Sequence, residues 1–169
     1  PVRAMLDAGV NVSLGTDGCG SIESASMLRV VSAAALVNKL RDDDPSRWIG
    51  AKEAWRAATL GGAQALGLGD TLGAIEPGRK ADLGLYRLDS IPFVPLNNPL
   101  GQLVYAESGA NLDLVMVDGK IVLRDGRLAG IDESLSHQKS HRVNTLIKIT
   151  GISAEIIMIE FCKESSVDR

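Results

Sequence analysis

The sequence predicts an α/β protein in which a mainly helical first part is followed by a mainly β second part. Apolar residues recur at helical spacing over residues 24–40, whereas short β-like runs bounded by turn residues dominate beyond residue 69. A β-rich run over residues 10–15 (VNVSLG) also lies between two helical stretches. The composition, 45% hydrophobic and 23% charged, is typical of a soluble globular protein with its own core.

The first region, residues 1–69, is expected to contain one strand among several helices. Residues 2–8 favour a helix, and the run over 10–15 predicts a strand that ends at Thr16, Asp17 and Gly18. The helix over 24–40 is expected to stop at an Asp-Asp-Asp-Pro break.

Two shorter, alanine-rich helices are predicted to complete this region. They span residues 52–60 and 63–66, with Gly61 and Gly62 between them.

The second region, residues 70–130, is expected to be a β domain. Strands are predicted over 81–88, 112–117 and 120–123, with an irregular proline-containing loop over 91–101. We interpret residues 131–169 as a tail of uncertain structure.

Two turns of the β region have a clear chemical reason. Pro77-Gly78 suits a type II turn, because proline presets φ and glycine supplies a positive φ. Asp118-Gly119 suits the type I′ turn of a hairpin.

The charge and the cysteine content limit the kinds of binding partner and the cellular compartment that we expect. The net charge is −3 and no basic cluster is present, so we expect no nucleic-acid partner. No apolar run approaches the roughly 18 residues of a membrane span. Cys19 and Cys162 form neither a disulfide framework nor a metal knuckle, which favours a cytoplasmic location.

The chain begins at Pro1, and we expect a C-terminal fragment of a longer protein.

Asp17 is the candidate active-site residue. A strand followed directly by an acidic residue, glycine and a helix describes the C-terminal mouth of a βα unit in a (β/α)8 barrel, the face that holds active sites. A carboxylate fixed there can bind a cation and stay near the water that the cation activates. The alternative is that Asp17 only closes a turn or caps the next helix.

Four segments, in this order and spacing, resemble the amidohydrolase superfamily. They are PVRAMLDAGVNVSLGTDG (1–18), EAWRAATLGGAQALGL (53–68), GAIEPGRKADLGLYRLD (73–89) and LVMVDGKIVLRDGRL (114–128). The similar branch contains S-adenosylhomocysteine and guanine deaminases and triazine chlorohydrolases. The resemblance implies the C-terminal part of a metal-dependent (β/α)8 TIM barrel followed by strands of a small β-sandwich, and a homodimer.

The resemblance implies that Asp17 ligates the metal and shuttles a proton. It implies one divalent metal ion, with zinc as the default and iron or manganese as alternatives, because one carboxylate does not define a coordination sphere. The implied reaction is hydrolytic deamination of an aminated N-heterocycle. Asp17 would take a proton from the attacking water and deliver it to the departing amine.

Several residues that follow Asp17 are weaker candidates for a functional role. Family members often continue with Ser-Asn-Asn or Ser-Asn-Asp, whereas this chain has Ser21, Ile22 and Glu23, so the substrate is expected to differ. Ser21 is either a substrate-binding residue or a helix cap, and Glu23 suits a first helical turn without a catalytic role. Cys19 could be a metal ligand or a reactive thiol, but a free cysteine more typically serves as a small apolar residue.

His137 and His141 have the spacing of a helical metal pair. They lie beyond the resemblance, in a polar stretch, so we interpret them as solvated.

Three functional hypotheses remain at the level of sequence. The first is deamination, and the second is displacement of chloride or an alkylamine from a triazine-like ring by the same activated water. The third is a catalytically inactive scaffold. Since only one ligand is recognised, we expect the 169 residues alone to be inactive and to bind zinc weakly.

Overall fold

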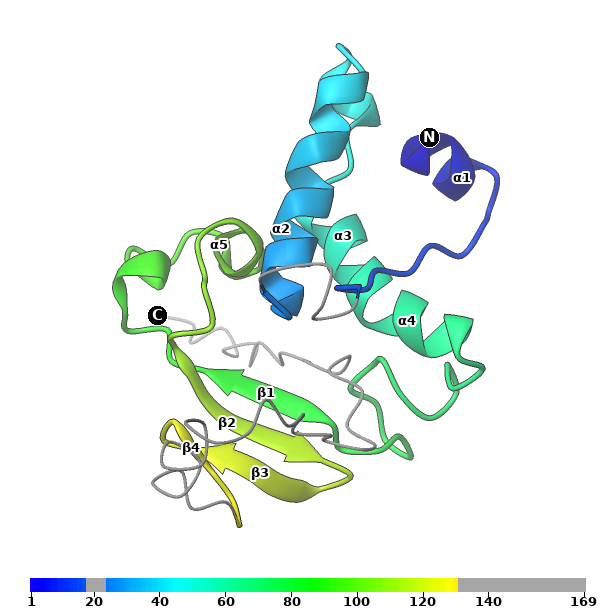
Figure 1. The fold of residues 1–169 in the computed structure, drawn as a ribbon. Helices are drawn as coiled ribbons and strands as arrows, with labels where there is room; N and C mark the ends of the chain where they lie inside the picture. Colours follow the sequence, from blue (N-terminus) through cyan, green and yellow to red (C-terminus); the bar gives the residue numbers. More distant parts are fainter. Residues whose placement is uncertain (18–23, 131–169) are drawn as a thin grey trace, which may run out of the picture.

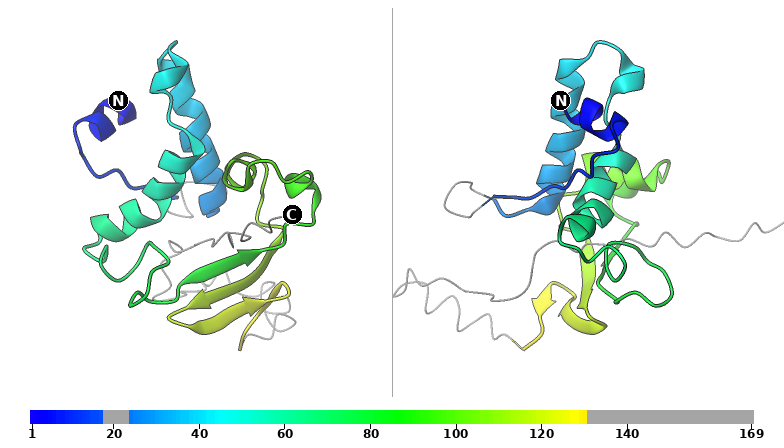
Figure 2. Two further views of the ribbon diagram at one scale, coloured as in Figure 1. Left: turned by 180° about the vertical axis from the view of Figure 1, so that it is seen from behind. Right: turned by 90° about the vertical axis from the view of Figure 1, so that its right-hand side faces the viewer.

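The computed structural model describes residues 1–17 and 24–130 as a helical layer over an antiparallel sheet (Figure 1). The helices lie on one side of the sheet, and the view from behind shows the same two layers (Figure 2). The α/β class predicted from the sequence is therefore confirmed. No helix within the described ranges is long and apolar enough to cross a membrane.

The chain starts with helix α1, Val2–Asp7, and continues as an extended segment that reaches Asp17. The prediction of a strand over residues 10–15 is wrong, because no residue of this run belongs to a strand. A strand needs a hydrogen-bonded neighbour, and no described strand pairs with this run. Its backbone instead contacts helices, as Leu14 N–H donates to the carbonyl of Ala57 at 3.2 Å.

The predicted helix over residues 24–40 is present with shifted bounds. Helix α2 spans Met27–Val37 and passes into the 3-10 helix η1, Asn38–Arg41. Its buried face presents Met27, Val31 and Ala35 to the core of the helical layer. Met27 and Val31 belong to the predicted apolar periodicity, whereas Val37 and Leu40, which continue it, are exposed.

Helices α3, Ala51–Ala58, and α4, Leu60–Ala65, follow the short 3-10 helix η2, Pro45–Arg47. The predicted break at Gly61 and Gly62 is wrong, because the break falls at Thr59. Thr59 has φ −112° and ψ −92°, and its hydroxyl donates to the carbonyl of Trp55 at 2.9 Å.

The proline-containing loop predicted over residues 91–101 is partly helical. It contains the 3-10 helix η3, Ile91–Phe93, and leads into helix α5, Pro99–Tyr105. Asn98 caps α5 by accepting from Gly101 N–H at 2.9 Å, and proline occupies the first helical position. Helix α5 contacts α2 and α3.

A small core joins this connection to the helical layer. Phe93 and Leu103 are fully buried and pack with Leu28 of α2. Tyr86 of strand β1, Leu83–Tyr86, packs against the same cluster, so this core also contacts the sheet.

The sheet contains four antiparallel strands in the order β1-β2-β3-β4. They are β1, Leu83–Tyr86, β2, Leu112–Val117, β3, Lys120–Arg124, and β4, Arg127–Leu128. The three predicted strands are confirmed with a shorter first strand, and β4 was not predicted.

The predicted turns have the backbone that their sequences favour. Gly78 has φ +91°, and Arg79 N–H donates to the carbonyl of Glu76 at 3.1 Å. Asp118 and Gly119, between β2 and β3, have φ +51° and +75°, as a type I′ turn requires.

Candidate active site

Asp17 lies at the end of the extended segment, where its side chain is exposed. Its backbone has φ +62°, in the left-handed region that aspartate tolerates better than most residues. The hydroxyl of Thr16 donates to the backbone carbonyl of Asp17 at 3.1 Å. The chain therefore turns sharply at Asp17, immediately before residues 18–23.

Helices α3 and α4 hold the segment that leads to Asp17. The side-chain amide of Asn11 donates to the carbonyl of Gly61 at 2.9 Å, and Leu14 N–H donates to the carbonyl of Ala57. Leu14 also packs against the core of the helical layer. Figure 1 and the view from behind in Figure 2 show the extended segment running beside these two helices.

Several candidates from the sequence fall outside the described residues. These are Ser21, Cys19 and Glu23 in the range 18–23, and His137 and His141 in the range 131–169. Their proposed roles stay predictions.

The described part of the chain does not bring together a complete metal site. Within residues 1–17 and 24–130, no three His, Cys, Asp or Glu side chains gather so that they could hold a metal ion. An exposed carboxylate on a rigidly held segment fits one position of a coordination sphere.

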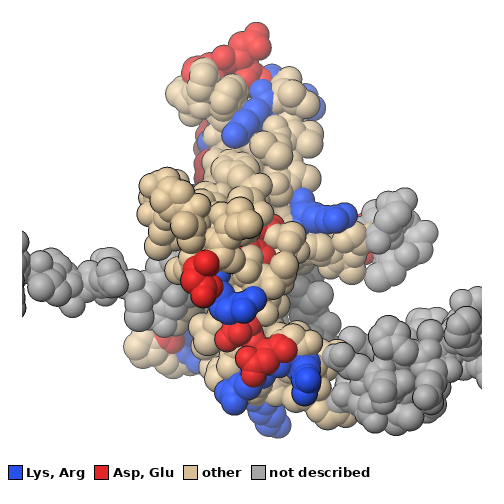
Figure 3. Space-filling view, turned by 90° about the vertical axis from the view of Figure 1, so that its left-hand side faces the viewer, with Lys and Arg blue, Asp and Glu red and all other residues tan. Residues whose placement is uncertain are grey.

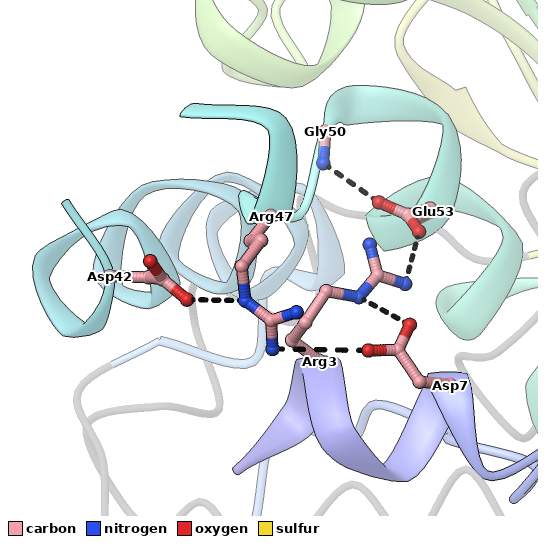
Figure 4. Close-up of polar contacts among 6 residues, drawn as sticks. All are labelled: Arg3, Asp7, Asp42, Arg47, Gly50 and Glu53. Carbon is pink, nitrogen blue, oxygen red and sulfur yellow. Dashed lines mark hydrogen bonds and ion pairs between the residues drawn. The ribbon is translucent and has the colours of Figure 1, made fainter. Parts of the chain in front are cut away.

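A network of charged side chains connects α1 to the helices around it (Figure 4). Arg3 contacts Glu53 of α3 at 2.7 Å and Asp7 at 3.1 Å. Arg47 contacts Asp42 at 2.7 Å and Asp7 at 3.9 Å. The network holds the start of the extended segment against the helical layer. The contact that links α1 to α3 joins Arg3 to Glu53, which are 50 positions apart, so local sequence patterns did not reveal it.

Two groups of this network have shifted pKa values. A backbone hydrogen bond from Asp44, together with Arg47, lowers the pKa of the Asp42 carboxyl. The hydrogen bond to Glu53 raises the pKa of the Arg3 guanidinium. Both shifts favour the charged forms that make the ion pairs.

Acidic and basic side chains are interspersed over the face of the molecule in Figure 3. That face presents neighbouring charges of both signs, consistent with the nearly balanced composition of 18 basic and 21 acidic residues.

Comparison with known proteins identifies relatives over most of the chain. The chain is 42% identical over 132 residues to 5-methylthioadenosine/S-adenosylhomocysteine deaminase of Acetivibrio thermocellus, covering 78% of this chain and 30% of the relative. It is 41% identical over 133 residues to 5′-deoxyadenosine deaminase of Methanothermobacter thermautotrophicus, with 79% and 30% covered. The chain thus spans about a third of the length of these curated relatives.

Solved structures of similar enzymes also match most of the chain. An adenosine deaminase of Xanthomonas campestris with bound zinc superposes with a TM-score of 0.79 at 36% identity, covering 83% of this chain and 32% of that one. Atrazine chlorohydrolase of Arthrobacter aurescens, also with zinc, gives a TM-score of 0.77 at 34% identity, with 83% and 31% covered. The Amidohydrolase family model matches residues 1–122. The resemblance predicted from the four sequence segments is thereby confirmed, and the chain belongs to the amidohydrolase family.

Proposed function

We propose that this chain supplies the catalytic aspartate of a metal-dependent hydrolase that removes the amino group of an adenosine-type nucleoside. The observation that carries the proposal is the place of Asp17, exposed at the end of a segment held by α3 and α4 in a member of the amidohydrolase family. Residues 1–69 would then be the last part of a (β/α)8 barrel, in which the extended run before Asp17 would take the place of the last strand once a neighbouring strand pairs with it. Residues 70–130 are part of a β-sandwich.

The chemistry requires a group that exchanges protons with two partners in turn. A divalent metal, with zinc as the first expectation, would lower the pKa of a water in the site toward about 7 when bound. Asp17 would accept a proton from the water as its oxygen forms a bond to the ring carbon. Asp17 would then return that proton to the departing amine, and the second water proton would pass to the neighbouring ring nitrogen. The C–N bond breaks, ammonia leaves and a ring carbonyl remains.

The relatives support adenosine-type substrates. The two curated relatives described above are named for deamination of 5-methylthioadenosine, S-adenosylhomocysteine and 5′-deoxyadenosine, and one similar structure is an adenosine deaminase. Each name refers to an adenine ring with an exocyclic amine. An adenosine derivative is therefore the first substrate class to test.

Chloride displacement is the second candidate, because a similar structure is an atrazine chlorohydrolase. The two reactions differ in leaving group while Asp17 would handle the water proton in the same way. Assaying ammonia and chloride release separately distinguishes them. The cytoplasmic location and the homodimeric state stay predictions.

The first prediction tests Asp17 in a chimera. In this chimera the chain replaces the matching C-terminal third of the Acetivibrio thermocellus deaminase. We expect Asp17→Asn to lower ammonia release from S-adenosylhomocysteine by about a hundredfold or more, because an amide cannot accept the water proton. The matched control is Asp125→Asn, since Asp125 also has a left-handed backbone, φ +51°, but lies in the turn after β3.

Two outcomes would contradict the proposal. One is a chimera in which Asp17→Asn keeps activity within about tenfold of the unmodified chimera. The other is a folded, zinc-loaded chimera without hydrolytic activity, which would favour the scaffold alternative. The 169-residue chain alone should release no ammonia.

A further inference from the structure

We propose that Gly61 is a positioning residue for Asp17, because its missing side chain lets the extended segment lie directly on helix α4. This inference rests on the proposed function, in which Asp17 is the proton shuttle. It goes beyond that function by assigning the placement of Asp17 to a helix contact within the chain.

The first observation is the close approach at Gly61. A Cβ atom built on Gly61 would lie 2.4 Å from the carbonyl oxygen of Val12 and 3.1 Å from that of Arg56. Both neighbours are backbone atoms, so neither can rotate away as a side chain does. Any residue other than glycine would therefore displace the extended segment or the helix.

The second observation is that hydrogen bonds flank this contact on both sides. Asn11, one residue before Val12, donates through its side chain to the carbonyl of Gly61 at 2.9 Å. Leu14, two residues after Val12, donates its N–H to the carbonyl of Ala57 at 3.2 Å. These bonds fix both the distance and the register of the segment against the helices.

The break between α3 and α4 makes this arrangement possible. Ala57 lies in the last turn of α3, where a carbonyl has no partner within its own helix. The interruption at Thr59 ends α3, so the N–H of Leu14 satisfies that carbonyl.

The contact bears on the site because Asp17 follows Leu14 by three residues along an extended backbone. Catalytic groups need placement within roughly 0.5 Å, and a misplacement of about 1 Å can cost about a hundredfold in rate. A segment displaced at Val12 therefore misplaces Asp17 without changing its chemistry.

The experiment compares Gly61→Ala with Gly62→Ala. The two glycines are neighbours in α4, but a Cβ on Gly62 would have nothing within 4 Å. Both variants add the same methyl group to α4 and change its helix propensity equally, but only the methyl group at position 61 clashes.

The first measurement is hydrogen exchange of residues 10–17 in the 169-residue chain. We expect Gly61→Ala to accelerate exchange of the Leu14 amide about tenfold or more, since its bond to Ala57 is lost, while the amides of β2 and β3 stay protected. Gly62→Ala should leave exchange at Leu14 unchanged.

The second measurement is steady-state kinetics in the deaminase chimera. We expect Gly61→Ala to lower kcat about tenfold to a hundredfold with KM within about threefold, because proton transfer is misplaced while substrate contacts remain. Gly62→Ala should match the unmodified chimera. A general loss of folding would instead lower the active fraction, which titration of bound zinc measures.

A second pair of variants covers the case in which Gly61→Ala does not fold. Asn11→Ala removes only the hydrogen bond to Gly61 and should reproduce a smaller loss of kcat. Ser13→Ala, at an exposed position two residues along the same segment, should not.

The outcomes separate the two proposals. Equal kcat for Gly61→Ala and Gly62→Ala, in a chimera that depends on Asp17, would overturn the positioning role alone. An active chimera indifferent to Asp17→Asn would overturn the proposed function, and with it any kinetic role for Gly61. Unchanged exchange at Leu14 in Gly61→Ala would overturn the contact itself.

Discussion

The helical layer and the antiparallel sheet differ in how far apart in sequence their contacts lie. In the helical layer, Val31 of α2 packs in one cluster with Ala54 of α3 and Val104 of α5. In the sheet, β2 pairs with β3 and β3 pairs with β4, and the two-residue turns Asp118-Gly119 and Asp125-Gly126 join these strands. One region depends on distant segments meeting, whereas the other depends mainly on local turns.

This difference explains where the candidate site lies. The extended segment before Asp17 is held by Ala57, which is 43 positions after Leu14, and by Gly61, which is 50 positions after Asn11. No turn or hairpin next to Asp17 could supply those contacts. The more local sheet carries none of the candidate catalytic residues, which suits a scaffold role.

The largest effect should come from removing the side chain that joins the two regions. Phe93 is fully buried and packs against residues of α2, α5 and β1. We expect Phe93→Ala to lower the free energy of unfolding by about 3–5 kcal/mol. Urea denaturation measures this loss. Ile91→Ala, at a side chain that is 94% exposed, is the control and should stay within about 0.5 kcal/mol. Equal effects would mean that Phe93 does not connect the regions.

A smaller effect is expected from a single turn of the sheet. Gly119 has φ +75° and a Cβ there would have nothing within 4 Å, so Gly119→Val tests backbone conformation alone. We expect a loss of about 1–2 kcal/mol in thermal unfolding, because a β-branched residue disfavours positive φ. The control Lys120→Val places the same side chain in strand β3, where valine is favoured. If both variants are equally stable, local turn geometry does not govern the sheet.

The smallest effect should come from the charged surface of the helical layer. Since the folded state lowers the pKa of Asp42, this carboxyl stabilises the protein above its unfolded pKa of about 3.9, and the contribution is lost as the pH falls through the lower folded value. Asp42→Asn should therefore slightly lower the melting temperature at neutral pH and make its decline below about pH 4 shallower. The exposed neighbour Asp43→Asn is the control. Parallel pH profiles for Asp42→Asn and the unmodified chain would contradict this assignment.

Local patterns in the amino-acid sequence were enough to predict several elements. Helix α2 follows from its apolar periodicity, and strands β2 and β3 follow from β-rich runs around Asp118-Gly119. The family resemblance and the candidacy of Asp17 also came from the residues alone. Helix α5 was missed although Asn98-Pro99 is a start signal, because the nearby prolines favoured a loop.

The arrangement of the region around Asp17 depends instead on contacts between distant segments. The run over residues 10–15 has the composition of a strand, but pairing depends on a neighbour that composition does not reveal. Gly61 and Gly62 are identical as local signals, yet a Cβ would clash at Gly61 and not at Gly62. The physical reason is that a close contact depends on which backbone lies opposite, and that backbone belongs to residues about 50 positions away.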